Sequence, residues 1–135
     1  MDVVGDYSFE LLKESVSLYS CSNYCREVFL GRCLPIFWSS EFISFTQHEK
    51  EISIFVSSKF DDYFKNLPVT KMEDEYRVLK VYQTNHGIEE LGIVAQFAKI
   101  FMDMEIPILY VNSFSNNYIL LPASHLEKLE GMIEF

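Results

Sequence analysis

The chain has 135 residues, of which 49% are hydrophobic and 16% aromatic, so it can bury a core without disulfides or a structural metal. Its formal net charge of −9, from 20 acidic and 11 basic residues, disfavours nucleic acid and anionic membrane surfaces as partners. The sequence shows no basic leader, no apolar signal core and no run of about twenty apolar residues, so we expect a cytoplasmic protein.

The first half of the sequence alternates short strands with short helices. Residues 15–19 alternate as in a half-buried strand, and residues 24–36 favour a short helix that ends before Pro35. Residues 42–46 and 52–56 then predict two strands joined by a polar turn, which together form a β-hairpin.

The second half repeats this order after a helical turn at residues 59–65 and a charged connector at residues 66–75. A strand at residues 76–82 comes first. Apolar residues with the spacing of one helix face follow, namely Ile93, Phe97, Ile100, Phe101 and Met104. Strands at residues 106–111 and 118–121 come next. The inner face of a last helix is formed by Leu126, Leu129 and Ile133.

Each half therefore reads strand–helix–strand–strand–helix, which is one strand short of a ferredoxin-like module. The closing strand of each antiparallel sheet must come from the other half or from a second chain, because a bare edge invites aggregation. Residues 76–82 could close the first unit while opening the second, so we expect strand exchange between the halves, or a dimer. The predicted fold class is α+β, with two ferredoxin-like units in tandem at residues 1–70 and 71–135.

The sequence offers weak candidates for catalysis or metal binding. Its cysteines form no CxxC pair and its histidines are scattered; these residues are Cys21, Cys25, Cys33, His48, His86 and His125. Cys25 paired with His48 or His86 is the enzymatic alternative, but no glycine-flanked elbow accompanies it. Buried, reduced thiols are the ordinary interpretation. We expect no enzymatic activity, no metal and no cofactor.

A loop, a helix start and a hairpin turn in the second half form the candidate binding segment. Residues 87–96 place glycines around an acidic pair, and residues 113–117 form a polar turn. The unpaired N–H groups of a first helical turn and the strand-edge amides near Ile108 can bind a carboxylate. Glu90 can bind an ammonium or guanidinium group, and Phe114 can stack on a side chain. The pattern favours binding of a small zwitterion over bond breaking.

These segments resemble the ACT domain family. The resemblance is carried by Gly-Ile-Val-Ala-Gln after the acidic pair, by the strand start Ile106-Pro107-Ile108 and by the turn Ser113-Phe114-Ser115-Asn116-Asn117-Tyr118. It is clearest over residues 76–133. Within the family, the pattern is most similar to the CASTOR-type cytosolic arginine sensors of the TOR pathway and to short two-ACT proteins.

The resemblance implies a regulatory module that binds an amino acid at an interface between paired ACT units. Such a module signals to a partner, either a second copy of the chain or a regulatory protein. The resemblance assigns ligand contact to Gly87, Glu90, Val94, Pro107, Ile108, Ser113, Phe114 and Asn117. The arginine-binding turn of the family carries an aspartate where this chain has Asn117, which removes a negative charge and disfavours arginine as the ligand.

Structural roles compete with these assignments. Glu90 fits the first turn of a helix, and Asn117 fits a left-handed turn position. Phe114 fits packing within a hairpin. A third class of function is a ligand-free interaction module that dimerises or docks on a larger protein. Its signature would be exposure of the aromatic residues Phe37, Trp38, Phe60, Tyr63 and Phe64.

Overall fold

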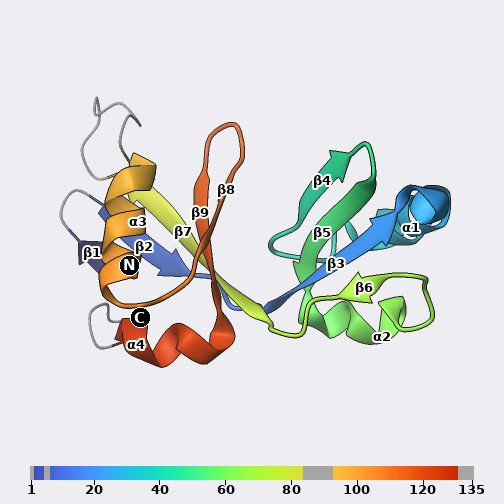
Figure 1. The fold of residues 1–135 in the computed structure, drawn as a ribbon. Helices are drawn as coiled ribbons and strands as arrows, with labels where there is room; N and C mark the ends of the chain where they lie inside the picture. The colour runs from blue at the N-terminus through green and yellow to red at the C-terminus, as the bar shows by residue number, and fades with distance from the viewer. Residues whose placement is uncertain (1, 5–6, 84–92, 131–135) are drawn as a thin grey trace. The chain divides into compact units, whose positions relative to one another are not determined.

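The computed structural model describes residues 2–4, 7–83 and 93–130, and the chain divides into two compact units (Figure 1). The continuous unit is Glu14–Tyr76. The split unit combines Met1–Lys13 with Arg77–Phe135, so its residues come from both ends of the sequence. Each unit has its own hydrophobic core.

The continuous unit is an antiparallel sheet with helices packed on one face. Its elements are β3 (Val16–Ser22), α1 (Arg26–Cys33), β4 (Ser44–His48), β5 (Glu51–Ser57), α2 (Asp61–Phe64) and β6 (Thr70–Lys71), with 3-10 turns η1 (Asn23–Cys25), η2 (Leu34–Ile36) and η3 (Ser58–Phe60). The strand order is β6–β3–β5–β4, and each of these pairings is antiparallel. The succession of elements is that of a ferredoxin-like module.

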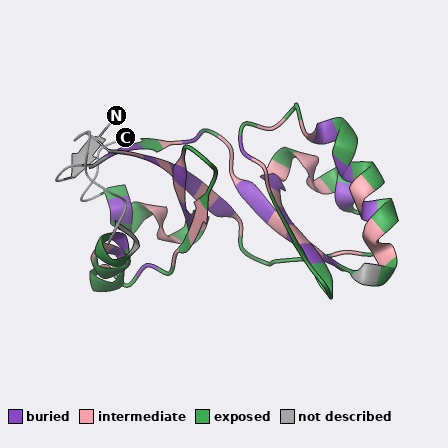
Figure 2. Ribbon diagram, turned by 90° about the horizontal axis from the view of Figure 1, so that it is seen from above, coloured by how far each residue is buried: buried purple, intermediate pink, exposed green. Residues whose placement is uncertain are grey.

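Alternation along the strands builds the core of the continuous unit. On β5, Ile52, Ile54 and Val56 are fully buried, while the residues between them are only partly buried. Phe29 of α1 and Phe64 of α2 pack in the same cluster, which appears as buried segments in Figure 2. Burial of one such side chain contributes about 1.5–3 kcal/mol, so the apolar face of the sheet is what holds both helices.

A partly buried carboxylate ties α2 to two strands of the continuous unit. The Tyr19 hydroxyl on β3 donates to Asp61 Oδ1 at 2.5 Å, and the Lys71 ammonium on β6 donates to Asp61 Oδ2 at 2.9 Å. Burial alone would raise the pKa of Asp61, but hydrogen bonds from Tyr19, Lys71 and Ser17 outweigh it and hold this pKa below its ordinary value. Burial and the Asp61 carboxylate together raise the pKa of Tyr19, so its hydroxyl remains a donor at neutral pH.

We predict that Asp61→Ala lowers the free energy of unfolding by about 1–2 kcal/mol at pH 7, because Tyr19 and Lys71 lose their shared acceptor. The folded-state pKa of Asp61 is depressed, so its contribution is present above the ordinary aspartate pKa of about 3.9 and is lost as the pH falls through the folded value. Urea denaturation between pH 7 and pH 3 measures both effects. Asp62→Ala, which removes the exposed neighbouring carboxylate, is the control; equal losses for the two variants at pH 7 would contradict the prediction.

The split unit is a second sheet of the same kind. Its elements are β1 (Asp2–Val4), β2 (Tyr7–Leu11), β7 (Tyr76–Gln83), α3 (Ile93–Asp103), β8 (Leu109–Asn112), β9 (Asn117–Pro122), the 3-10 turn η4 (Ala123–His125) and α4 (Leu126–Glu130). The strands pair in the order β1–β2–β7–β9–β8. β7 begins at Tyr76, the last residue of the continuous unit.

One core cluster places α3 and α4 on the same face of the split unit's sheet. Phe97 and Phe101 of α3 and Leu129 of α4 pack with Phe9 of β2 and Val81 of β7. The predicted apolar stripe of α3 is therefore confirmed for Phe97, Ile100, Phe101 and Met104, which all belong to this core or pack against it, while the side chain of Ile93 lies outside what the structure describes. No helix within the described ranges combines the length and the hydrophobicity needed to cross a membrane.

The N-terminal strand β2 closes the sheet of the split unit. It runs antiparallel to β7 with Phe9 opposite Val81, and the N–H of Leu12 donates to Val78 O at 2.9 Å just beyond the strand. The expected exchange of a strand between the halves is thus confirmed. Residues 1–13 pair with β7 although the sequence placed them in the first unit, so the observed division differs from the expected boundary between residues 70 and 71.

The strand β6 closes the continuous unit. It lies inside the connector expected at residues 66–75, and Thr70 and Lys71 are both exposed, so no apolar alternation marks it in the sequence. The prediction that residues 76–82 close the first unit is wrong, because only Tyr76 among them pairs with β3.

The C-terminal end of α3 determines where β8 begins. Glu105 has a left-handed φ of 56°, and its N–H donates to Met102 O at 2.9 Å. The N–H of Ile106 donates to Phe101 O at 2.9 Å, which completes a Schellman motif. Ile106 is buried in the core as part of this cap, and Pro107 has no N–H to donate. The strand expected from residue 106 therefore starts at residue 109.

Glycine usually occupies the left-handed position of a Schellman motif, because a side chain is strained there. We predict that Glu105→Gly raises the free energy of unfolding by about 1 kcal/mol. Ala98→Gly, within the same helix on its exposed side, should lower it by about 1 kcal/mol. Guanidinium denaturation followed by circular dichroism compares the two variants, and a loss of stability for both would rule out strain at Glu105.

Candidate functional site

The ligand contacts expected from the sequence fall in the split unit, and the structure describes most of them. Gly87 and Glu90 lie outside the described residues. Val94 lies in the first turn of α3, where its backbone is described. The side chains of the other expected contacts are described: Pro107 and Ile108 before β8, and Ser113, Phe114 and Asn117 at the β8–β9 turn.

The turn between β8 and β9 is closed by its own hydrogen bonds. The N–H of Ser113 donates to Asn116 O at 2.9 Å, and the N–H of Asn116 donates to Ser113 Oγ at 3.1 Å. Asn112 and Asn117 form the last cross-strand pair before this turn. Ser113 therefore has a structural role: its hydrogen bonds to Asn116 close the turn around residues 114 and 115.

Phe114 and Asn117 occupy contrasting environments in this turn. The Phe114 side chain is fully exposed, so the packing role considered for it is absent from this structure. Asn117 is only 9% exposed and is engaged with neighbouring groups. A ring that contributes nothing to the core but is held on a closed turn is suited to contact a ligand or a partner.

The expected contacts that the structure describes lie at two ends of the split unit. The first turn of α3 and the β8–β9 turn lie at the same end, as Figure 1 shows. Pro107 and Ile108 precede β8 and therefore lie at the other end of that strand, roughly 17 Å from Ser113 at about 3.3 Å per residue. Pro107 is exposed, and Ile108 packs against the core. An amino acid held at the α3 end of the unit cannot reach this pair within the same unit.

The continuous unit has a hollow at the end of its sheet where β3 leads into η1 and α1. The sequence did not indicate this hollow as a site. The hollow is about 290 Å³ and lies where β3 ends and the β4–β5 turn leads into β5. It is lined by Ser20, Cys21, Ser22, Lys50, Glu51, Pro68 and Thr70. Ser20 Oγ donates to Glu51 Oε2 at 3.3 Å, and Lys50 lies beside it in sequence. An ammonium and a carboxylate side by side can bind the two charges of a zwitterion.

Two of the thiols of the continuous unit, Cys21 and Cys33, are unsuited to nucleophilic catalysis. Cys33 is fully buried, and burial raises its pKa to about 12. Burial also raises the pKa of Cys21. Both side chains are therefore neutral thiols near pH 7. In the part of the chain that the structure describes, no group of three His, Cys, Asp or Glu side chains is placed to hold a metal ion.

The two units define the class of fold: α+β, with two ACT-like ferredoxin-type βαββα units in tandem, each completed by a further strand. The family model of the ACT domain matches residues 71–129, which contain the β7–α3–β8–β9 succession and all but the last residue of α4. No protein of curated function matches the chain.

Solved structures of similar fold cover nearly the whole chain. A protein from Agobacterium tumefaciens aligns with a TM-score of 0.66 at 18% identity, over 95% of this chain and 87% of that one. The ligand-free regulatory subunit of aspartate kinase from Thermus thermophilus aligns with a TM-score of 0.60 at 9% identity, over 88% and 89%. A putative C-terminal regulatory domain of aspartate kinase from Porphyromonas gingivalis gives 0.55 at 14%, over 96% and 98%. At these identities the likeness concerns the fold.

We predict that Phe114→Ala changes the free energy of unfolding by no more than about 0.5 kcal/mol, because the ring is fully exposed. Asn117→Ala should lower it by about 1 kcal/mol or more, because a buried amide loses its partners. Urea denaturation of both variants checks this difference. A large loss for Phe114→Ala would show that the ring packs in the protein and is not available for binding.

Proposed function

We propose that this protein is a non-enzymatic regulatory protein that binds an amino acid or a similar small metabolite through its ACT-like units. The observation that carries the proposal is the ACT-domain match at residues 71–129, which covers the first turn of α3 and the β8–β9 turn at one end of the split unit. The solved relatives of similar fold include regulatory parts of aspartate kinases, which supports a regulatory role over a catalytic one.

The proposed ligand contacts divide by chemistry. A first helical turn leaves N–H groups without intrahelical partners, so the start of α3 would offer such groups to the ligand carboxylate. Glu90 would bind its ammonium group, and Phe114 would cover its side chain. The amide of Asn117 is neutral, so we propose that the ligand has an uncharged side chain rather than the guanidinium of arginine. The resemblance to the arginine sensors remains part of the proposal.

Pro107 and Ile108 require a second unit in this proposal. They lie at the other end of β8, so they would contact a ligand held by another ACT-like unit, of this chain or of a second one. Ligand binding would then stabilise one arrangement of the units and change the surface offered to a partner, which we propose to be a second copy or a regulatory protein. A coupling of about 1–3 kcal/mol is usual for such switches.

A ligand-free interaction module is the second candidate function, and one observation favours it. Of the five aromatic residues that would mark it, Phe64 is buried at 1% exposure, whereas Trp38 is 96% exposed. The exposed indole of Trp38 would be available for contact with another molecule, which favours this candidate.

Calorimetric titration with each of the twenty amino acids tests the proposal. We expect saturable binding of one or a few of them, weakened roughly tenfold or more by Glu90→Ala and by Phe114→Ala because each removes a direct contact. Met102→Ala, an exposed substitution on the outer side of α3, should leave the affinity unchanged. Absence of binding across the panel by the folded protein would favour the interaction module, and binding that survives both substitutions would place the site elsewhere.

A further inference from the structure

The outer face of α1 carries an apolar stripe that the core of the continuous unit does not use. The stripe consists of Tyr24, Val28, Gly31, Leu34 and Trp38, with exposures of 100%, 54%, 62% and 96% for its four side-chain-bearing members in that order. Val28 and Gly31 lie on α1, Tyr24 lies in η1, Leu34 begins η2 and Trp38 follows η2, so the five residues run along the helix and the turns at its two ends. The inner side of the helix is already occupied, since Phe29 and Cys33 are buried.

Gly31 lies at the centre of this stripe. No contact within the described chain requires a glycine at this position. A Cβ at this position would meet no atom within 4 Å. Glycine in an exposed helix is unfavourable compared with alanine, so the fold of the unit alone favours a side chain here. A glycine that is exposed on one molecule allows the backbone of another helix to approach closely, which offers a reason for it.

The order of residues about Gly31 is self-complementary. When two copies of a helix pack antiparallel about a two-fold axis at Gly31, each residue before it faces the residue equally far after it in the other copy. Tyr24, seven residues before, then faces Trp38, seven residues after. Val28, three before, lies at the level of Leu34, three after. Aromatic residues thus meet aromatic residues and aliphatic residues meet aliphatic ones, while the two Gly31 backbones form the crossing point.

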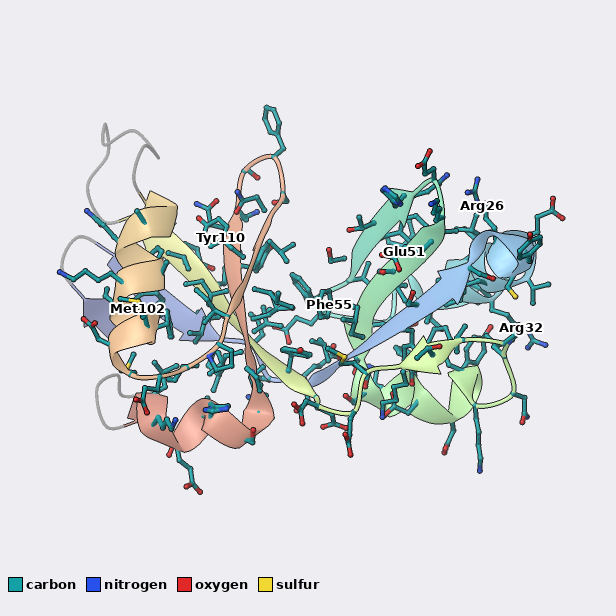
Figure 3. All side chains as sticks on the ribbon, in the orientation of Figure 1. Arg26, Arg32, Glu51, Phe55, Met102 and Tyr110 are labelled. Atoms are coloured by element: carbon teal, nitrogen blue, oxygen red, sulfur yellow. The ribbon has the colours of Figure 1, made fainter. Side chains whose placement is uncertain are left out.

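A hollow beside Tyr24 is large enough to receive the indole of Trp38 from a second copy of the chain. It has a volume of about 550 Å³ and is lined by Tyr24, Arg26, Glu27 and Val28. An indole in this hollow can stack on Tyr24 and donate its N–H to the Glu27 carboxylate, so its polar atom is satisfied. Arg26 lines the hollow and Arg32 leaves the helix in a different direction (Figure 3). The helix therefore presents both signs of charge within a chain of net charge −9, which removes the general repulsion locally.

We propose that this stripe is a homodimer surface, in which α1 packs antiparallel on α1 of a second copy with Gly31 at the crossing and Trp38 in the hollow at Tyr24. Burial of the two aromatic and two aliphatic side chains from both copies removes about 1,000 Å² of surface, which is near the lower limit for a specific interface. We therefore expect a reversible dimer of micromolar affinity. The inference does not depend on amino-acid binding.

Trp38 is the single tryptophan of the chain, so its fluorescence reports directly on this surface. The experiment measures sedimentation equilibrium and tryptophan emission of the full chain from about 1 μM to several hundred μM. We expect a monomer–dimer equilibrium, with emission that shifts to shorter wavelength over the same concentration range. A monomer at every concentration, or a dimer with unchanged Trp38 emission, would overturn the proposal.

Two variants and a matched control decide whether the stripe is responsible. Val28→Gln should raise the dissociation constant at least about tenfold, while Met102→Gln, an exposed apolar residue on the outer side of α3, should leave it unchanged. Gly31→Ala should raise the melting temperature by a few degrees and weaken the dimer, because it favours the helix but obstructs the crossing. Equal effects of Val28→Gln and Met102→Gln, or a Gly31→Ala dimer as tight as the wild type, would contradict the assignment.

Discussion

The architecture depends on the backbone hydrogen bonds of two strands, β3 and β7, each of which has a neighbour on both sides. β3 lies between β5 and β6, and β7 lies between β2 and β9. A strand edge without a partner leaves a row of N–H and C=O groups open to other chains. The second half of the sequence contains no further strand to cover β7 among its described residues, and the N-terminal segment takes that place. This pairing is the reason that one unit contains residues from both parts of the sequence, and it brings Phe9 into the core beside Val81.

Local patterns predicted the elements that alternate or repeat strongly. The helix face of α3 was evident because Phe97 and Phe101 recur at helical spacing, and β5 was evident because Ile52, Ile54 and Val56 alternate with more polar residues. The two closing strands, β6 and β2, were not evident from local patterns, for different reasons. β6 consists of two exposed residues without a pattern. β2 has the alternation of a half-buried strand, but its partner is distant in sequence, and periodicity contains no information about pairing.

The elements around the candidate site could be predicted from the sequence, but their arrangement could not. A polar hairpin turn at residues 113–117 and a helix before it were expected, and the structure places that turn and the first turn of α3 at the same end of the unit. The position of Pro107 and Ile108 depends on the Schellman motif at Glu105. A glycine at the left-handed position would have indicated this motif in the sequence, but the residue there is a glutamate. Exposure of Phe114 depends on how far the hairpin extends beyond the core, which no local pattern reveals.

Two of the hollows of the continuous unit are lined by residues that lie close together along the chain. Ser22, at the end of β3, lines the hollow that holds Lys50 and Glu51, and Tyr24, in η1, lines the hollow proposed to receive Trp38. Because β3 passes into η1 and then α1 without a loop, a change in the position of the strand end acts directly on the first residue of the stripe. A ligand that orders Ser20 and Ser22 and a second copy that orders Tyr24 would therefore bias the same short segment. Coupling between two such events is reciprocal, so association of two chains would change the affinity of this hollow by the factor with which its ligand changes association.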